Sequence, residues 1–346
     1  MLLLTTTCLY PCILAGPMQW HPGGRLCTAG RLQSPIDVEP DNLLFDPAMT
    51  SLRVQRLNER AAKDELVRLT NTGQLIVLSV GPEERARHKS RQDRTMLSSV
   101  VVSQGPLRYT YTVDKVVFHM ANAWRGNGSE HTLQGRRFLG EIQMFGYNSD
   151  FYTNFSEAAS KPHGLVALSI FVEPLADGDH LYQQKTASQL ETLSDSVAKV
   201  VAGGSYVTLA DVDVTGFLPE TRDVVTYEGS LPFPDCQETV TWVLFNKPIF
   251  ISKRAFTQWT HLYTTVDGRR SDEMAVVDDA PPPSIAFPNY RRTNPLHGRL
   301  LRTNINFKTG NKGGACPTME QGISYKLNEQ FFRAKSRMRR ETGGYP

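Results

Sequence analysis

The sequence predicts one large, mainly β domain with a few short helices. Six short runs rich in Val, Ile, Phe and Tyr are typical of strands: 75–80, 100–104, 109–120, 138–147, 165–173 and 240–252. The run "GLVALSIFV" (164–172) is apolar almost without alternation, which predicts a central strand buried on both faces. Helical periodicity is sparse and is best developed over 188–203 and 252–263.

Length and composition indicate a globular chain with a substantial core. The chain has 346 residues, of which 40% are hydrophobic, and neither a repeat nor a Gly/Ser linker divides it. The predicted division is a signal-like segment (1–16), one domain (17–308) with a charged loop insertion (83–94), and a basic tail (309–346). The net charge of +3 is small for this length, so no nucleic-acid partner is expected.

The first residues predict export. "MLLLTTTCLYPCILAG" contains an apolar run of signal-peptide length, too short to span a bilayer, so no transmembrane segment is expected. It lacks the usual early Lys or Arg, and the alternative is a mis-assigned start or an ordinary apolar terminus. Two glycosylation sequons, at Asn127 and Asn154, agree with a secreted, extracellular glycoprotein.

Cysteine usage leaves two interpretations open. Of five cysteines, the first two would leave with a cleaved signal, and Cys27, Cys236 and Cys316 would remain. An odd number in an exported protein indicates one bridge and one thiol that is free or pairs with another chain. In a cytosolic protein all three would be reduced thiols.

Five motifs, taken together, resemble a known family. They are "LQSPIDVEP", "GNGSEHTLQGRRF", "EIQMFGYN", "GLVALSIFVE" and "YEGSLPFPDCQETVTWVLFNKPIFIS". Their order and rough spacing are similar to those of the α-carbonic anhydrases over about residues 20–308. The resemblance implies the α-carbonic anhydrase fold, a large, twisted, mostly antiparallel central sheet with a few short peripheral helices and a cone-shaped cleft. Active members hold zinc through three histidines and lower the pKa of its bound water to roughly 7.

The resemblance also implies that this chain has lost zinc ligands. It places Gln143 at the third ligand position and His119 at one of the other two. The remaining position falls on Val117 if His119 is the second histidine, or on Ala121 if it is the first. Either register leaves one histidine of three, so no metal and no cofactor are expected.

The positions around the ligands change as well. The gatekeeper threonine of the family falls on Pro232 and its proton-shuttle histidine on Gln74. The valines that line the carbon dioxide pocket fall on Phe145 and Ala167. Two glutamates persist: Glu130 as the partner of the gatekeeper, and Glu141 as the residue that orients the third ligand.

Within the family the chain resembles the catalytically silent carbonic anhydrase-related proteins of types X and XI. "NFSEAA", "RTNINF" and "ACP…YKLNE" carry this likeness. It implies a secreted, often neural glycoprotein with a Cys27–Cys236 disulfide that binds a cell-surface protein of the neurexin type. Cys316 is then a candidate for a disulfide-linked complex, although Leu300 departs from the cysteine common in these relatives.

The expected function is therefore that of a non-catalytic binding or adhesion ligand. One alternative is an active zinc carbonic anhydrase, a carbonate dehydratase that uses His119, Gln143 and a third, unforeseen ligand. Another is an intracellular structural partner. No GxSxG, Walker loop, HExxH or CxxC occurs in the sequence, so other common catalytic classes lack support.

Overall fold

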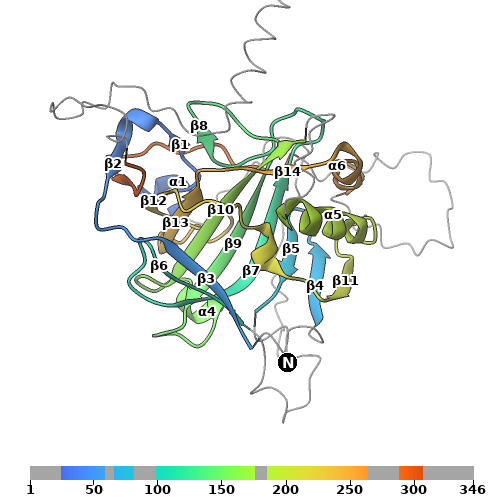
Figure 1. Cartoon of the computed structure of the whole chain (residues 1–346), viewed down its shortest axis with the longest axis horizontal. Helices are drawn as coiled ribbons and strands as arrows, with labels where there is room; N and C mark the ends of the chain where they lie inside the picture. The colour runs from blue at the N-terminus through green and yellow to red at the C-terminus, as the bar shows by residue number, and fades with distance from the viewer. Residues whose placement is uncertain (1–24, 59–65, 82–98, 176–184, 264–287, 307–346) are drawn as a thin grey trace, which may run out of the picture.

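The computed structural model describes residues 25–58, 66–81, 99–175, 185–263 and 288–306 (Figure 1). The signal-like segment, the charged insertion, the basic tail and Cys316 lie outside the described residues. No helix in the described ranges is long and apolar enough to cross a membrane.

The described residues form many short strands and few helices. The strands are β1 Asp37–Val38, β2 Leu43–Phe45, β3 Leu52–Leu57, β4 Leu66–Asn71, β5 Ile76–Ser79, β6 Ser99–Gln104, β7 Tyr111–Met120, β8 Thr132–Leu133, β9 Gly140–Asn148, β10 Leu165–Pro174, β11 Tyr206–Ala210, β12 Val224–Gly229, β13 Val240–Phe245, β14 Ile249–Ile251 and β15 Leu301–Thr303. The α-helices are α1 Arg25–Ala29, α4 Phe155–Ala158, α5 Lys185–Val197 and α6 Lys253–Trp259, and the 3₁₀ turns are η1 Pro40–Asn42 and η4 Val214–Phe217.

A 13-stranded sheet dominates the fold, which confirms the predicted fold class. Its main path runs β11-β4-β5-β7-β9-β10-β13-β12-β15-β2. β14 lies beside β10, and β6 pairs with both β3 and β7. The pairs β10–β13, β10–β14 and β15–β2 are parallel, and the others in this sheet are antiparallel.

The strongest sequence patterns became elements close to their predicted ranges. The run 164–172 is the core of β10, whose residues are buried from Leu165 to Glu173. The predicted helix at 188–203 instead spans Lys185–Val197. Beyond Val197 the backbone N–H groups of Lys199 and Val200 bond to carbonyls three residues back, at 3.1 and 3.0 Å, so the chain turns there and leaves the α-helical pattern.

The two faces of the sheet bury different side chains. On one face β7, β9 and β10 pack against α5, α6 and η4, which lie together on one side of the strands (Figure 1). Because side chains alternate along a strand, the neighbouring residues point to the opposite face. That second face carries an aromatic cluster that includes Phe145 and Trp242.

Candidate functional site

The candidate site lies on the second face, where β7 and β9 run side by side. In this antiparallel pair Val117 is directly opposite Gln143, and His119 is opposite Glu141. Ala121 lies one residue beyond the end of β7 and packs in the core of the first face. The structure therefore places Val117, rather than Ala121, in the row with His119 and Gln143.

The His119 ring is hydrogen-bonded to a backbone carbonyl and lies near a buried carboxylate. The ring is buried, with 1% exposed, and Nδ1 lies 3.0 Å from the carbonyl oxygen of Asn289. A carbonyl only accepts, so Nδ1 carries the proton in this contact. Nε2 has no hydrogen-bond partner among the described residues and lies 3.9 Å from Oε2 of Glu130.

Gln143 connects two buried carboxylates. Its Nε2 donates to Oε2 of Glu130 and to Oε1 of Glu141, both at 3.0 Å. Carboxylates accept and do not donate when ionised, so this contact fixes which end of the amide faces them. Oε1 of Gln143 is left without a hydrogen-bond partner among the described residues.

Glu141 collects five hydrogen bonds. Its Oε1 accepts from His131 Nδ1 and Ser169 Oγ, each at 2.8 Å, and from Gln143. Its Oε2 accepts from the backbone N–H groups of Glu130 and His131, at 2.9 and 2.8 Å. Burial alone would raise the pKa of this carboxyl group, but the adjacent His131 and its hydrogen bonds lower the pKa to about 2.

A relay of polar groups extends from Glu141 across the sheet. His131 Nε2 lies 2.6 Å from the Tyr227 hydroxyl, which lies 2.9 Å from Ser34 Oγ, and Ser34 Oγ accepts from the backbone N–H of Ser230 at 3.0 Å. The Tyr227 hydroxyl donates its one proton to Ser34 Oγ, so its oxygen can accept a hydrogen bond from His131 Nε2. His131 is a fully buried imidazole, and both of its ring nitrogens have hydrogen-bond partners.

Glu130 accepts hydrogen bonds from a backbone N–H and from a side-chain amide. In active members of the family, the gatekeeper threonine hydroxyl donates to this glutamate. Its Oε1 accepts from the backbone N–H of Arg291 at 2.9 Å, and its Oε2 accepts from Gln143. Pro232, at the gatekeeper position, is buried and offers neither a hydroxyl nor an N–H group.

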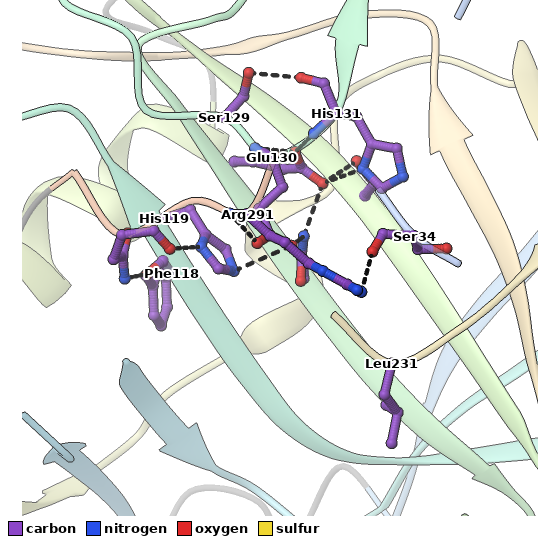
Figure 2. Close-up of polar contacts among 12 residues, drawn as sticks. Ser34, Phe118, His119, Ser129, Glu130, His131, Leu231 and Arg291 are labelled. Atoms are coloured by element: carbon purple, nitrogen blue, oxygen red, sulfur yellow. Dashed lines mark hydrogen bonds and ion pairs between the residues drawn. The ribbon is translucent and has the colours of Figure 1, made fainter. Parts of the chain in front are cut away.

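Arg291 contacts the segment that contains Ser34 through its guanidinium group, as Figure 2 shows. Its guanidinium donates to the carbonyls of Ser34 and Cys27, at 2.8 and 2.7 Å, and to Gln33 Oε1 at 3.0 Å. Cys27 is bonded to Cys236 across 209 residues of sequence. The disulfide and the hydrogen bonds of Arg291 therefore join four distant parts of the chain: residues 27–34, Glu130, Cys236 and Arg291.

Aromatic side chains occupy the space beside the ligand row. Phe145 is fully buried and packs edge-on against Trp242 and Phe233, with ring centroids 5.7 and 5.4 Å apart. It lies opposite Ala167 in the pairing of β9 with β10. Gln74 lies apart from this cluster, with its carbonyl accepting from the Asn289 amide at 3.2 Å.

A family model for eukaryotic-type carbonic anhydrases matches residues 15–305. The chain belongs to this family. "Putative carbonic anhydrase-like protein 2" of Caenorhabditis elegans is 35% identical over 322 residues, which covers 91% of this chain and 85% of that protein. "Putative carbonic anhydrase-like protein 1" of the same organism is 32% identical over 356 residues, with 86% and 89% of the two chains covered.

The side chains of this carbonic anhydrase family member do not fit a catalytic zinc ion. Such a site needs three protein ligands. The row offers one imidazole, the hydrocarbon of Val117 and a neutral amide, and amide oxygens suit harder cations than Zn²⁺. Among the described residues, no group of three His, Cys, Asp or Glu side chains could hold a metal ion.

Sequence reasoning missed the contacts made by Asn289 and Arg291. Asn289 supplies a carbonyl to His119 and donates its amide to the carbonyl of Phe118 at 3.2 Å. Arg291 supplies a backbone N–H to Glu130. Backbone groups are the same in every residue, so no residue type in the sequence marks the carbonyl contact to His119 or the N–H contact to Glu130.

Proposed function

We propose that the chain is a secreted, non-catalytic carbonic anhydrase-related protein that acts as a binding ligand for a cell-surface protein. The observation that supports the loss of catalysis most directly is the contact of Gln143 with Glu130 and Glu141. A zinc ligand would direct a lone pair toward the metal. The Gln143 amide instead directs its two N–H groups toward the two carboxylates, one to each. The amide of Gln143 thereby links Glu130 and Glu141, the two buried carboxylates beside the former ligand positions.

Three further changes support the same conclusion. Val117 supplies no ligand atom beside His119, and Pro232 has no hydroxyl oxygen to accept a hydrogen bond from a hydroxide. Phe145 packs against Trp242 in the family's carbon dioxide pocket. Hydration of carbon dioxide needs all of these elements together. One loss could be compensated, but simultaneous losses leave no route to an activated water.

The competing function is that of an active zinc carbonic anhydrase. It is favoured by one observation, that His119 Nε2 and Gln143 Oε1 are both buried without hydrogen-bond partners among the described residues. Purified full-length protein equilibrated with zinc and then dialysed is expected to retain substoichiometric metal and to hydrate carbon dioxide at the buffer rate. An active α-carbonic anhydrase carried through the same procedure is the control. One zinc per chain with turnover, both lost in His119→Ala, would establish the competing function.

The binding role rests on the family resemblance and on the predicted export. The resemblance to types X and XI implies a partner of the neurexin type, with Cys316 able to form a disulfide-linked complex in an oxidising compartment. The Cys27–Cys236 disulfide is compatible with export. Reduced Cys27 and Cys236 together with unmodified Asn127 and Asn154 in protein from its natural cells would instead favour the intracellular alternative.

We expect the full-length protein to bind saturably to cells that display a neurexin ectodomain. A zinc chelator should leave this binding unchanged, because no metal takes part. On non-reducing gels part of the complex should survive denaturation, and Cys316→Ser should remove that fraction. Cells without the ectodomain are the control. Equal binding to both kinds of cell would exclude this partner, and a persistent covalent fraction in the variant would exclude Cys316.

A further inference from the structure

An aromatic side chain stands exposed on the loop between β9 and α4. Phe151 is 61% exposed although it is one of the largest apolar side chains. Its ring meets Tyr109 edge-on at 4.9 Å and Tyr152 at 6.3 Å between centroids. Tyr109 and Tyr152 contact the Phe151 ring but leave much of its surface exposed to solvent. A contact with another group would therefore remove apolar surface from water.

Three residues further on is the sequon asparagine Asn154. Its Oδ1 accepts from the backbone N–H of Glu157 at 2.9 Å and so caps α4, while its Nδ2 donates to Thr153 Oγ1 at 3.2 Å. The hydroxyl-bearing residue of the sequon, Ser156, is exposed. A glycosylated amide keeps its oxygen and one N–H, so both the cap and a bond to Thr153 are compatible with an attached sugar.

The segment between the two residues is short and held in place. Three residues span at most about 10 Å, so a sugar attached to Asn154 begins within reach of the Phe151 ring. The backbone N–H and the hydroxyl of Thr153 both donate to Oε2 of Glu157, at 2.9 and 2.7 Å. The exposed ring and the amide are therefore fixed relative to each other by hydrogen bonds on the intervening residues.

We propose that the first N-acetylglucosamine of a glycan on Asn154 packs its C–H face against Phe151. Attachment joins Nδ2 to the anomeric carbon of the sugar, which leaves a lipid diphosphate carrier while the amide loses one proton. Polarised C–H groups on one face of the sugar suit the electron-rich face of an aromatic ring, and the contact covers apolar area. This inference rests on the export that forms part of the proposed function. It also names the group that covers the exposed ring of Phe151.

The other sequon, at Asn127, also has an aromatic residue three positions earlier, but that residue packs against the protein core. Trp124, three residues before Asn127, is half-buried and packs on Phe256 with ring centroids 5.4 Å apart. The ring is therefore engaged with the core of the first face. A glycan on Asn127 is expected to extend into solvent, which makes this sequon an internal comparison for Asn154.

Oxidative footprinting of the full-length chain tests the contact. A heterologous signal sequence directs the chain into the secretory pathway of cultured cells, so the test does not depend on natural export. Hydroxyl-radical oxidation of Phe151 is compared before and after enzymatic removal of the glycan, which converts Asn154 to an aspartate. Aspartate is an equally good N-cap, so α4 keeps its cap. Oxidation of Phe151 is expected to rise several-fold on deglycosylation, while Tyr206, 59% exposed, serves as the unchanged reference.

A double-mutant cycle gives an independent measurement. Phe151→Ala should lower the thermal midpoint by about 2 °C more in the glycosylated protein than in the Ser156→Ala background, which lacks the sequon but keeps Asn154 as the cap. An unmodified Asn154, equal oxidation of Phe151 with and without the glycan, or equal midpoint changes in the two backgrounds would each overturn the inference. None of these results bears on zinc content or on binding to a cell-surface partner, which test the proposed function separately.

Discussion

Replacing Glu141 by glutamine is expected to lower the free energy of unfolding by about 3–5 kcal/mol at neutral pH. Glu141 is fully buried and accepts five hydrogen bonds. An amide of the same shape has one oxygen and one NH₂ group. Either orientation turns an NH₂ group toward N–H or O–H donors that now have no acceptor, and each buried donor left unsatisfied costs about 1–3 kcal/mol.

The pH dependence of stability should change in the same variant. The pKa of Glu141 falls from an ordinary value of 4.5 to about 2 on folding, so its stabilisation is present above pH 4.5 and is lost as the pH falls toward 2. Wild-type protein should therefore lose up to about 1.4 kcal/mol per pH unit from this group across that window. Urea unfolding at a series of pH values measures both effects, and the variant should show a shallower slope.

The exposed Glu220 provides the matched control. Glu220→Gln makes the same chemical change where water solvates the carboxylate, and it should alter stability by less than about 0.5 kcal/mol. A Glu141→Gln protein as stable as the control at neutral pH would show that the network does not depend on an ionised carboxylate.

The strands could be predicted from their two-residue period, whereas the loss of zinc ligands was expected from the resemblance to the α-carbonic anhydrases. The alternation that buries Phe118 on one face places Val117 and His119 on the other, and the pairing with β9 brings Gln143 opposite Val117. The choice between Val117 and Ala121 could not be made from the sequence, because it depends on where β7 ends and on which residue β9 places opposite each position.

Contacts between residues far apart in the sequence could not be predicted from local sequence patterns. Arg291 donates its backbone N–H to Glu130 across 161 residues, and its guanidinium holds the carbonyl of Cys27 across 264. The side-chain amide of Asn71 likewise donates to the carbonyls of Val200 and Val201, about 130 residues away. Local propensity carries no information about such partners, which are set by the assembled sheet.

Restoring two histidines should restore metal binding without restoring catalysis. In Val117→His with Gln143→His, imidazoles would stand at both altered ligand positions around His119, on the opposed strands that already place these residues side by side. Three imidazoles suit Zn²⁺ and leave a fourth position for water. Competition with a chelating dye is expected to show a one-to-one zinc complex several orders of magnitude tighter than that of the wild type, and Val117→His alone should gain much less.

Carbon dioxide hydration by this double variant should nevertheless stay close to the buffer rate. Pro232 has no hydroxyl to accept a hydrogen bond from the zinc-bound hydroxide, so it cannot orient that hydroxide. Phe145 still packs against Trp242 where the substrate would bind. Adding Pro232→Thr and Phe145→Val should raise turnover by roughly 100-fold, because a positioned hydrogen-bonding group in a closed site is worth about that factor. If the double variant alone turned over as fast as the fourfold one, the missing ligands would be the sole cause of inactivity. A fourfold variant that binds zinc and remains inactive would place the defect in the surrounding network, where Glu130 Oε1 still accepts a hydrogen bond from the backbone N–H of Arg291.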